Sequence, residues 1–197
     1  MLDHLPPAPI APNVPSGTPL GKIQIPSIDV DWTFVQGVKY HDLKNGPGHF
    51  RESPLPGQLG NAAIAGHRTT WGAPFFHLDQ LEAGDEIVTI TALGRHVWQV
   101  TESFVVPPSD YRSVVPTKDP DKPTLTLVTC TPAYTASARL VVRAELQNDE
   151  SDQVYAAPDV LPKPEVFQDD GDITEAVVSP STTIGSGEPS TPGTLPA

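Results

Sequence analysis

The chain has 197 residues and a single cysteine, Cys130. One cysteine excludes an intramolecular disulfide framework and any zinc site built from several thiolates. It does not fix the redox compartment, because a free thiol suits the cytosol and also an extracytoplasmic protein whose thiol must stay reactive. Since a free cysteine is most often a small buried hydrophobe, a catalytic role for Cys130 needs support from the rest of the sequence.

The sequence also lacks a long apolar run and an excess of basic residues. No stretch approaches the ~20 apolar residues of a membrane span, and residues 1–20 lack the basic-then-apolar pattern of a signal peptide. We therefore expect a protein that is soluble as encoded, or one whose membrane anchor is absent from this sequence. The formal net charge of −12 favours neither nucleic acid nor an anionic membrane surface as a partner.

The negative charge is concentrated at the C-terminal end, where residues 149–197 hold ten acidic residues and one lysine. The abundance of Pro, Ser, Thr, Asp and Glu predicts a disordered acidic tail over residues 148–197. Residues 1–19 contain six prolines, which predict an extended N-terminal arm. Between the arm and the tail, residues 20–147 are predicted to form one domain.

Within this domain, short β-prone runs are separated by glycine and proline. Two brief stretches, residues 40–46 and 74–81, predict helical turns. About seven short strands with little helix favour a closed all-β barrel over a layered α/β fold. The predicted strands cover residues 22–26, 28–35, 61–66, 86–93, 96–106, 124–130 and 139–146.

Three residues at strand ends are candidates for one site. Cys130 ends the run TLTLVTC, and Arg139 begins the next predicted strand. Antiparallel pairing of these strands brings the end of the first beside the start of the second. His67 follows the run NAAIAG, where a barrel strand reaches its rim. A thiol becomes a nucleophile where an acid–base group and a positive charge converge on it, and these three residues supply such a set.

The segments GNAAIAGHRTTWGAPFFHLDQLEAGDEI and TLTLVTCTPAYTASARLVVRAEL closely resemble the sortases, the cysteine transpeptidases of Gram-positive cell surfaces. The sortase pattern is a His at an AGH strand end, a TLxTC strand, and an Arg opening the next strand. His67, residues 126–130 and Arg139 match it. The stretches GPGHF, LPGQLGN and GHRTTWGAPF are most similar to class E sortases of actinobacteria. The resemblance covers residues 20–147 and implies a closed sortase-type barrel of about eight strands.

The resemblance implies a cysteine transpeptidase of the hydrolase class, acting on secreted proteins with a C-terminal LAXTG-type (LPXTG-like) sorting signal. The Cys130 thiolate is expected to attack between Thr and Gly, and a peptidoglycan precursor amine to resolve the thioacyl intermediate. His67 is then the general acid–base. Arg139 binds the oxyanion or the substrate backbone, because a guanidinium cannot act as a base. Thr129 is expected to line the site, through its hydroxyl or by placing the following amide.

The resemblance requires neither a metal nor an organic cofactor. It implies an extracytoplasmic location at the cell surface, with contact to the membrane only through an anchor that is not present in this sequence. Two alternatives stay open: a pilus-polymerising sortase and a catalytically inactive β-barrel binding module. Pilus-type sortases resemble this chain in the core but carry a lid with an Asp-Pro-aromatic motif, which residues 1–20 lack. The intact Cys/His/Arg set argues against an inactive module.

The remaining titratable residues match no sortase role. His41, His49, His77 and His96 are expected to be surface or half-packed residues, since a lone histidine can hydrogen-bond without catalysing anything. Four acidic residues between positions 79 and 86 suggest either a hard-cation site or a solvated acidic face. Their spacing matches no calcium loop, so the solvated face is favoured.

Overall fold

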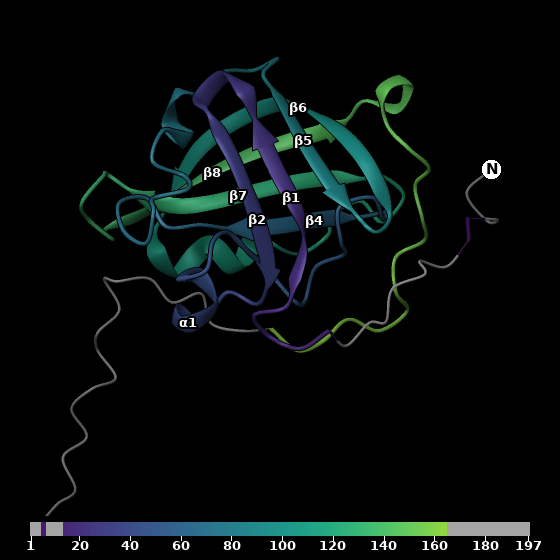
Figure 1. The fold of residues 1–197 in the computed structure, drawn as a ribbon, viewed down its shortest axis with the longest axis horizontal. Helices are drawn as coiled ribbons and strands as arrows, with labels where there is room; N and C mark the ends of the chain where they lie inside the picture. The colour runs from purple at the N-terminus through teal and green to yellow at the C-terminus, as the bar shows by residue number, and fades with distance from the viewer. Residues whose placement is uncertain (1–4, 7–13, 165–197) are drawn as a thin grey trace, which may run out of the picture.

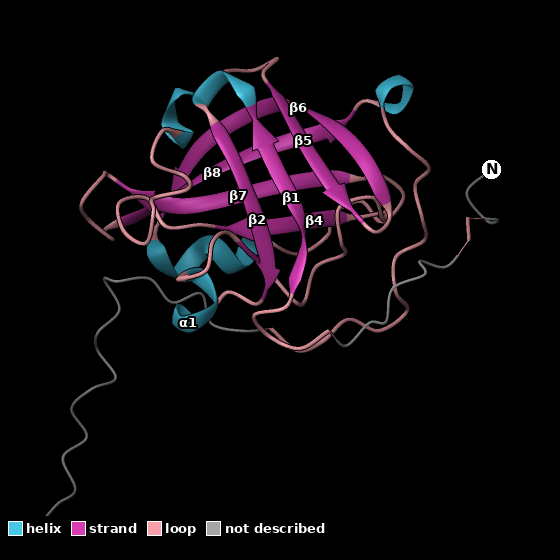
Figure 2. Ribbon diagram, viewed as in Figure 1, coloured by secondary structure: helices cyan, strands magenta, loops and turns pink. Residues whose placement is uncertain are grey.

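Eight strands close into a barrel in the computed structural model, which describes residues 5–6 and 14–164 (Figures 1 and 2). The order around the barrel is β1–β2–β3–β4–β7–β8–β6–β5, and β5 closes it against β1. This confirms the predicted all-β barrel. The strands are β1 (Pro19–Ile25), β2 (Val30–Gln36), β3 (Gly48–His49), β4 (Asn61–Ala65), β5 (Glu86–Thr91), β6 (Gly94–Val106), β7 (Thr124–Thr131) and β8 (Ala138–Leu146).

In the described residues, helical structure is confined to short segments on the connections. They are α1 (Tyr40–Leu43) and the 3-10 turns η1 (Pro26–Ile28), η2 (Leu78–Gln80), η3 (Pro108–Ser113) and η4 (Asn148–Glu150). The helix predicted over residues 74–81 is reduced to η2, because the backbone bonds here span three residues and not four, as from the Leu78 amide to the Phe75 carbonyl at 3.3 Å. No helix within the described ranges has the length and apolar character needed to cross a membrane.

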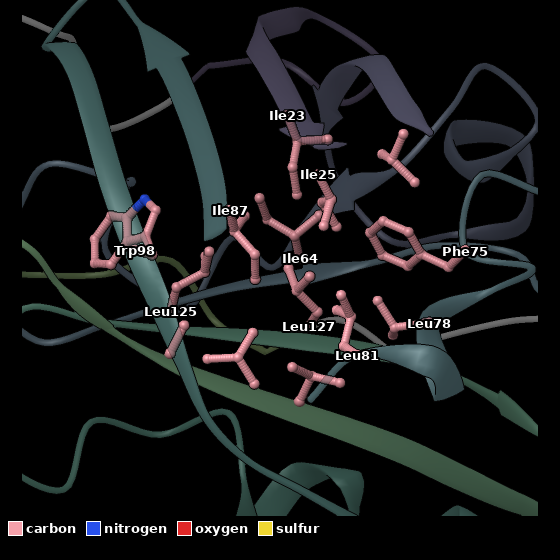
Figure 3. Close-up of a cluster of buried hydrophobic side chains, with 14 of the residues drawn as sticks. Ile23, Ile25, Ile64, Phe75, Leu78, Leu81, Ile87, Trp98, Leu125 and Leu127 are labelled. Atoms are coloured by element: carbon pink, nitrogen blue, oxygen red, sulfur yellow. The ribbon is translucent and has the colours of Figure 1, made fainter. Parts of the chain in front are cut away.

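The barrel interior is filled by alternate residues of the strands. Leu125 and Leu127 of β7 point inward beside Ile64 of β4 and Trp98 of β6 (Figure 3). Successive strand side chains face opposite sides, so the residues between them point outward. Val128 of β7 accordingly belongs to a second apolar cluster, on the outer face of the barrel.

The second cluster covers the outer face of β4, β7 and β8. Ala63, Ala65, Val128 and Val141 contribute from the strands, and residues in and after η3, such as Tyr111, Val114 and Val115, pack over them. Strands that are buried on both faces read as continuous apolar runs instead of alternating ones. This explains why NAAIA in β4 and LVV in β8 show so little alternation of polar and apolar residues.

The chain beyond residue 147 is attached to the barrel, which corrects part of the expected disordered tail. Residues 148–164 run along one side of the barrel (Figure 1). The Arg95 amide donates to the Asp152 carboxylate at 2.7 Å, and the Tyr155 amide donates to the Gly57 carbonyl at 2.9 Å. The Ala156 amide reaches the Pro6 carbonyl in the N-terminal arm at 3.2 Å. Backbone and short polar side chains dock this segment, which composition does not predict. Residues 165–197 of the expected tail, and residues 1–4 and 7–13 of the arm, lie outside the described residues.

Two histidines expected near the surface are buried. His49 lies between β2 and β4, with Nδ1 2.9 Å from the Gln36 side-chain oxygen and Nε2 2.9 Å from the Pro54 carbonyl. Burial lowers the pKa of His49 to about 4, although the Pro54 contact acts in the opposite direction. His96 lies beneath the attached segment and contacts the Gln153 carbonyl at 3.2 Å.

The attachment of residues 148–164 predicts a difference between two truncated chains. A chain ending at residue 147 loses the contacts with Arg95, Gly57 and His96 that a chain ending at residue 164 keeps. At about 0.5–1.5 kcal/mol for each hydrogen bond, we expect a loss of about 2–5 kcal/mol and a melting temperature lower by roughly 5–15 °C. Thermal unfolding followed by circular dichroism measures this. Equal melting temperatures for the two chains contradict the attachment.

Candidate active site

The antiparallel pairing of β7 with β8 brings Cys130 and Arg139 together. In this ladder the Cα atoms of Cys130 and Arg139 are direct partners. Their side chains extend from the same face of the sheet, because directly opposite residues of an antiparallel pair point the same way. The neighbouring partners Val128 and Val141 belong to the outer cluster, so Cys130 and Arg139 lie on the outer face of the barrel.

The parallel pairing of β4 with β7 brings His67 to the same place. The register pairs Ala65 with Val128, and the Gly66 amide donates to the Val128 carbonyl at 3.0 Å. Two residues further along each segment, the same register places His67 opposite Cys130. Gly66 has to be small here, because a Cβ atom at this position would lie 2.6 Å from the ring of the buried Phe75. The three predicted catalytic residues therefore meet at one rim of the barrel.

All three residues are shielded from solvent, with exposed fractions of 2% for His67, 8% for Cys130 and 5% for Arg139. A charge interacts more strongly with its neighbours in a buried site than at the surface, because the local dielectric constant is lower than that of water. The thiolate is the nucleophilic form of cysteine, and reactive thiols occur where an acid–base group and a positive charge converge, as these three residue types allow. The arrangement therefore suits nucleophilic attack by the sulfur atom on a carbonyl carbon.

Arg139 is held in a fixed orientation by the loop between β7 and β8. Its Nη1 atom donates to the Ala136 carbonyl at 3.0 Å and to the Ala138 carbonyl at 3.2 Å. A guanidinium is planar, so anchoring one nitrogen sets the directions of its other N–H groups. This preorganised fork is suited to a developing oxyanion or a substrate carbonyl.

Thr129 is buried, and its hydroxyl donates to the Gly66 carbonyl at 2.8 Å. The neighbour of the nucleophile is thus tied to the residue that precedes His67. Of the two roles expected for Thr129, this contact suits the placement of backbone better than direct contact of the hydroxyl with substrate. A positioning role for Thr129 is our proposal.

Arg68 is a residue of this site that sequence reasoning missed. It is buried, and its guanidinium contacts the Cys130 carbonyl, the Thr131 hydroxyl, the Phe76 carbonyl and the Asp79 carboxylate. In the sequence, the only feature that could have indicated Arg68 as a site residue is its position directly after His67. Asp79, one of the acidic residues weighed as a cation ligand, is therefore an ion-pair partner of Arg68. No group of three or more His, Cys, Asp or Glu side chains in the described chain is arranged to hold a metal ion.

Comparison with known proteins gives the family. The family model of the sortase domain matches residues 23–147. Sortase D of Bacillus subtilis (strain 168) is 30% identical over 124 residues, which cover 62% of this chain and 60% of that protein. Sortase SrtE1 of Streptomyces coelicolor is 30% identical over 153 residues, which cover 71% of this chain and 43% of that protein. The chain thus spans less than two thirds of the length of these relatives.

Solved structures agree with the family model. Sortase D5 of Clostridium perfringens, described as a transpeptidase, is 34% identical with a TM-score of 0.63 and covers 69% of this chain and 83% of that chain. Sortase E1 of Streptomyces coelicolor, solved with a tripeptide in its active site, is 29% identical with a TM-score of 0.61 and covers 69% of this chain and 92% of that chain. The match to the family model covers the end of β1, all of β2 to β8 and the residues that meet at the rim, and this chain belongs to the sortase family.

Proposed function

We propose that this chain is a transpeptidase that cleaves an LAXTG-type sorting signal between Thr and Gly and joins the sorted protein to the amine of a peptidoglycan precursor. The observation that carries the proposal is the direct pairing of Cys130 with Arg139 at the rim that His67 also reaches. Family membership supports it. So does a sortase C structure from Clostridium perfringens with a C-terminal cell wall sorting motif, which is 29% identical to this chain.

The first half of the reaction forms a thioester. The Cys130 thiolate attacks the carbonyl carbon of the Thr residue in the signal, and the carbonyl oxygen becomes an oxyanion. The anchored fork of Arg139 donates hydrogen bonds to this oxygen. His67 donates a proton to the nitrogen of the leaving Gly, since an amine leaves only when it is protonated. The C–N bond breaks, and the Thr acyl group remains on the sulfur atom.

The second half transfers the acyl group. The amine of the acceptor attacks the thioester carbonyl, and His67 takes up the proton that the amine loses. The C–S bond breaks and the Cys130 thiolate is restored, so no metal or organic cofactor enters the scheme. We place the reaction at the cell surface, where sorting signals of secreted proteins and peptidoglycan precursors are both present. A pilus-polymerising enzyme differs in the acceptor, which is then the side-chain amine of a second protein.

Alanine at either reacting residue tests the chemistry. We expect Cys130→Ala to abolish cleavage of a fluorogenic LAXTG-type peptide, because no other thiol exists in the chain. We expect His67→Ala to lower kcat/KM by ~10²–10⁴-fold, the range typical of a general acid–base. His41→Ala is the matched control, because the His41 side chain is 68% exposed and lies outside the site.

The same assay also tests the alternative that this chain is a catalytically inactive binding module. Binding of the peptide without cleavage by the unsubstituted chain, at any acceptor concentration, supports the module and contradicts the proposed activity. A fall of less than tenfold in His67→Ala removes His67 from the proton transfers. Circular dichroism shows that each variant retains its fold.

Substitution of Arg139 by lysine tests the role of its guanidinium group. Lysine keeps the positive charge but has no planar fork that can bind the loop carbonyls and an oxyanion together. We expect turnover to fall by ~10²–10³-fold in both Arg139→Lys and Arg139→Ala, with a much smaller change in the alkylation rate of Cys130. Arg95→Lys is the matched control, since Arg95 is exposed and contacts the Glu150 carbonyl far along the chain. Near-normal turnover in Arg139→Lys leaves only a role for its charge.

A further inference from the structure

β4 and β7 stop pairing immediately beside the reacting residues. The paired register ends at Ala65 and Val128, and the Gly66 amide makes the next hydrogen bond, to the Val128 carbonyl. In a continuing parallel ladder, the next amide of this segment to donate would be that of residue 68, and its acceptor would be the Cys130 carbonyl. The side chain of Arg68 takes this place, with Nη1 lying 3.4 Å from the Cys130 carbonyl oxygen and 3.2 Å from the Thr131 hydroxyl.

The opposite edge of the same guanidinium is bound by the segment that follows His67. Nε donates to the Phe76 carbonyl at 3.1 Å, and Nη2 lies 2.7 Å from a carboxylate oxygen of Asp79. Arg68 is itself 6% exposed, whereas half of the Asp79 side chain is open to solvent. A buried positive charge is tolerated when it is paired and hydrogen-bonded, and here every edge of the guanidinium has a partner.

We propose that Arg68 is a positioning residue that fixes the end of β7, with Cys130, against the segment that carries His67. The inference rests on the proposed function, because it concerns the separation of the thiol and the imidazole in that reaction. The partners of Arg68 are two backbone carbonyls, a hydroxyl and a carboxylate, so it acts through the backbone of Cys130 and of the segment that follows His67. The ion pair with Asp79 orients the guanidinium for these contacts.

Arginine is required for this role, and lysine does not replace it. The contacts lie on both edges of one plane, which matches the rigid set of donors of a guanidinium. An ammonium group is a single point of charge and reaches the partners on one side only. A displacement of the reacting groups by about 1 Å is enough to cost ~10²-fold in rate.

The test compares Arg68→Lys with Arg95→Lys, an exposed arginine in the same barrel. We expect Arg68→Lys to lower kcat for the sorting peptide by roughly tenfold to a hundredfold with little change in KM, because binding contacts remain while the reacting groups shift. We also expect the curve of Cys130 alkylation rate against pH to move away from that of the unsubstituted chain. Arg95→Lys should leave both unchanged.

A second variant covers the case in which Arg68→Lys does not fold. Asp79→Ala removes a half-exposed carboxylate, and we expect the same displacement of the alkylation curve and a smaller fall in kcat, with Asp79→Glu restoring both. The alkylation measurement needs no substrate, so it tests Arg68 even if the unsubstituted chain cleaves no sorting peptide, a result that would count against the proposed function alone. Folded variants with lowered melting temperatures but unchanged kcat and unchanged alkylation curves overturn the positioning role.

Discussion

The register of three neighbouring strands determines the candidate active site. β7 pairs in parallel with β4 and antiparallel with β8, and this pairing brings the ends of β4 and β7 and the start of β8 to one rim. A shift of one residue in either ladder would move a reacting side chain to the other face, because strand side chains alternate. The apolar filling of the barrel by residues such as Leu125 and Leu127 excludes such a shift. Core packing thereby fixes the positions of His67, Cys130 and Arg139.

Burial of the site has a second consequence, which concerns the polar groups around it. Where the ladder between β4 and β7 ends, backbone carbonyls would be left without donors in a place that water reaches poorly. Two side chains supply donors there: the Thr129 hydroxyl binds the Gly66 carbonyl, and Arg68 binds the Cys130 carbonyl. The end of the ladder is thus compatible with a buried and ordered backbone. Thr129, next to Cys130, and Arg68, next to His67, share this task.

Sequence reasoning predicts what depends on local pattern. The strand ending at Cys130 and the strand beginning near Arg139 are predicted within one residue, because β-prone runs mark both and Pro123 and Pro132 flank the first. Contacts made by backbone or by distant partners leave no such mark. The attachment of residues 148–164 rests on backbone bonds such as that from Tyr155 to Gly57, and the burial of His49 depends on Gln36 and Pro54. Arg68 and Asp79 are likewise ordinary charged residues in the sequence until the fold brings them together.

The most direct test of Cys130 as the nucleophile is intact-mass spectrometry of the chain mixed with an LAXTG-type peptide. Without an added amine we expect an increase in mass equal to the peptide portion that ends at Thr, located on Cys130 by proteolytic mapping. Addition of an amine acceptor should remove this increase and yield the joined product. Cleavage of the peptide between Thr and Gly without any adduct on Cys130, or with the adduct on another residue, would contradict a covalent mechanism through this thiol.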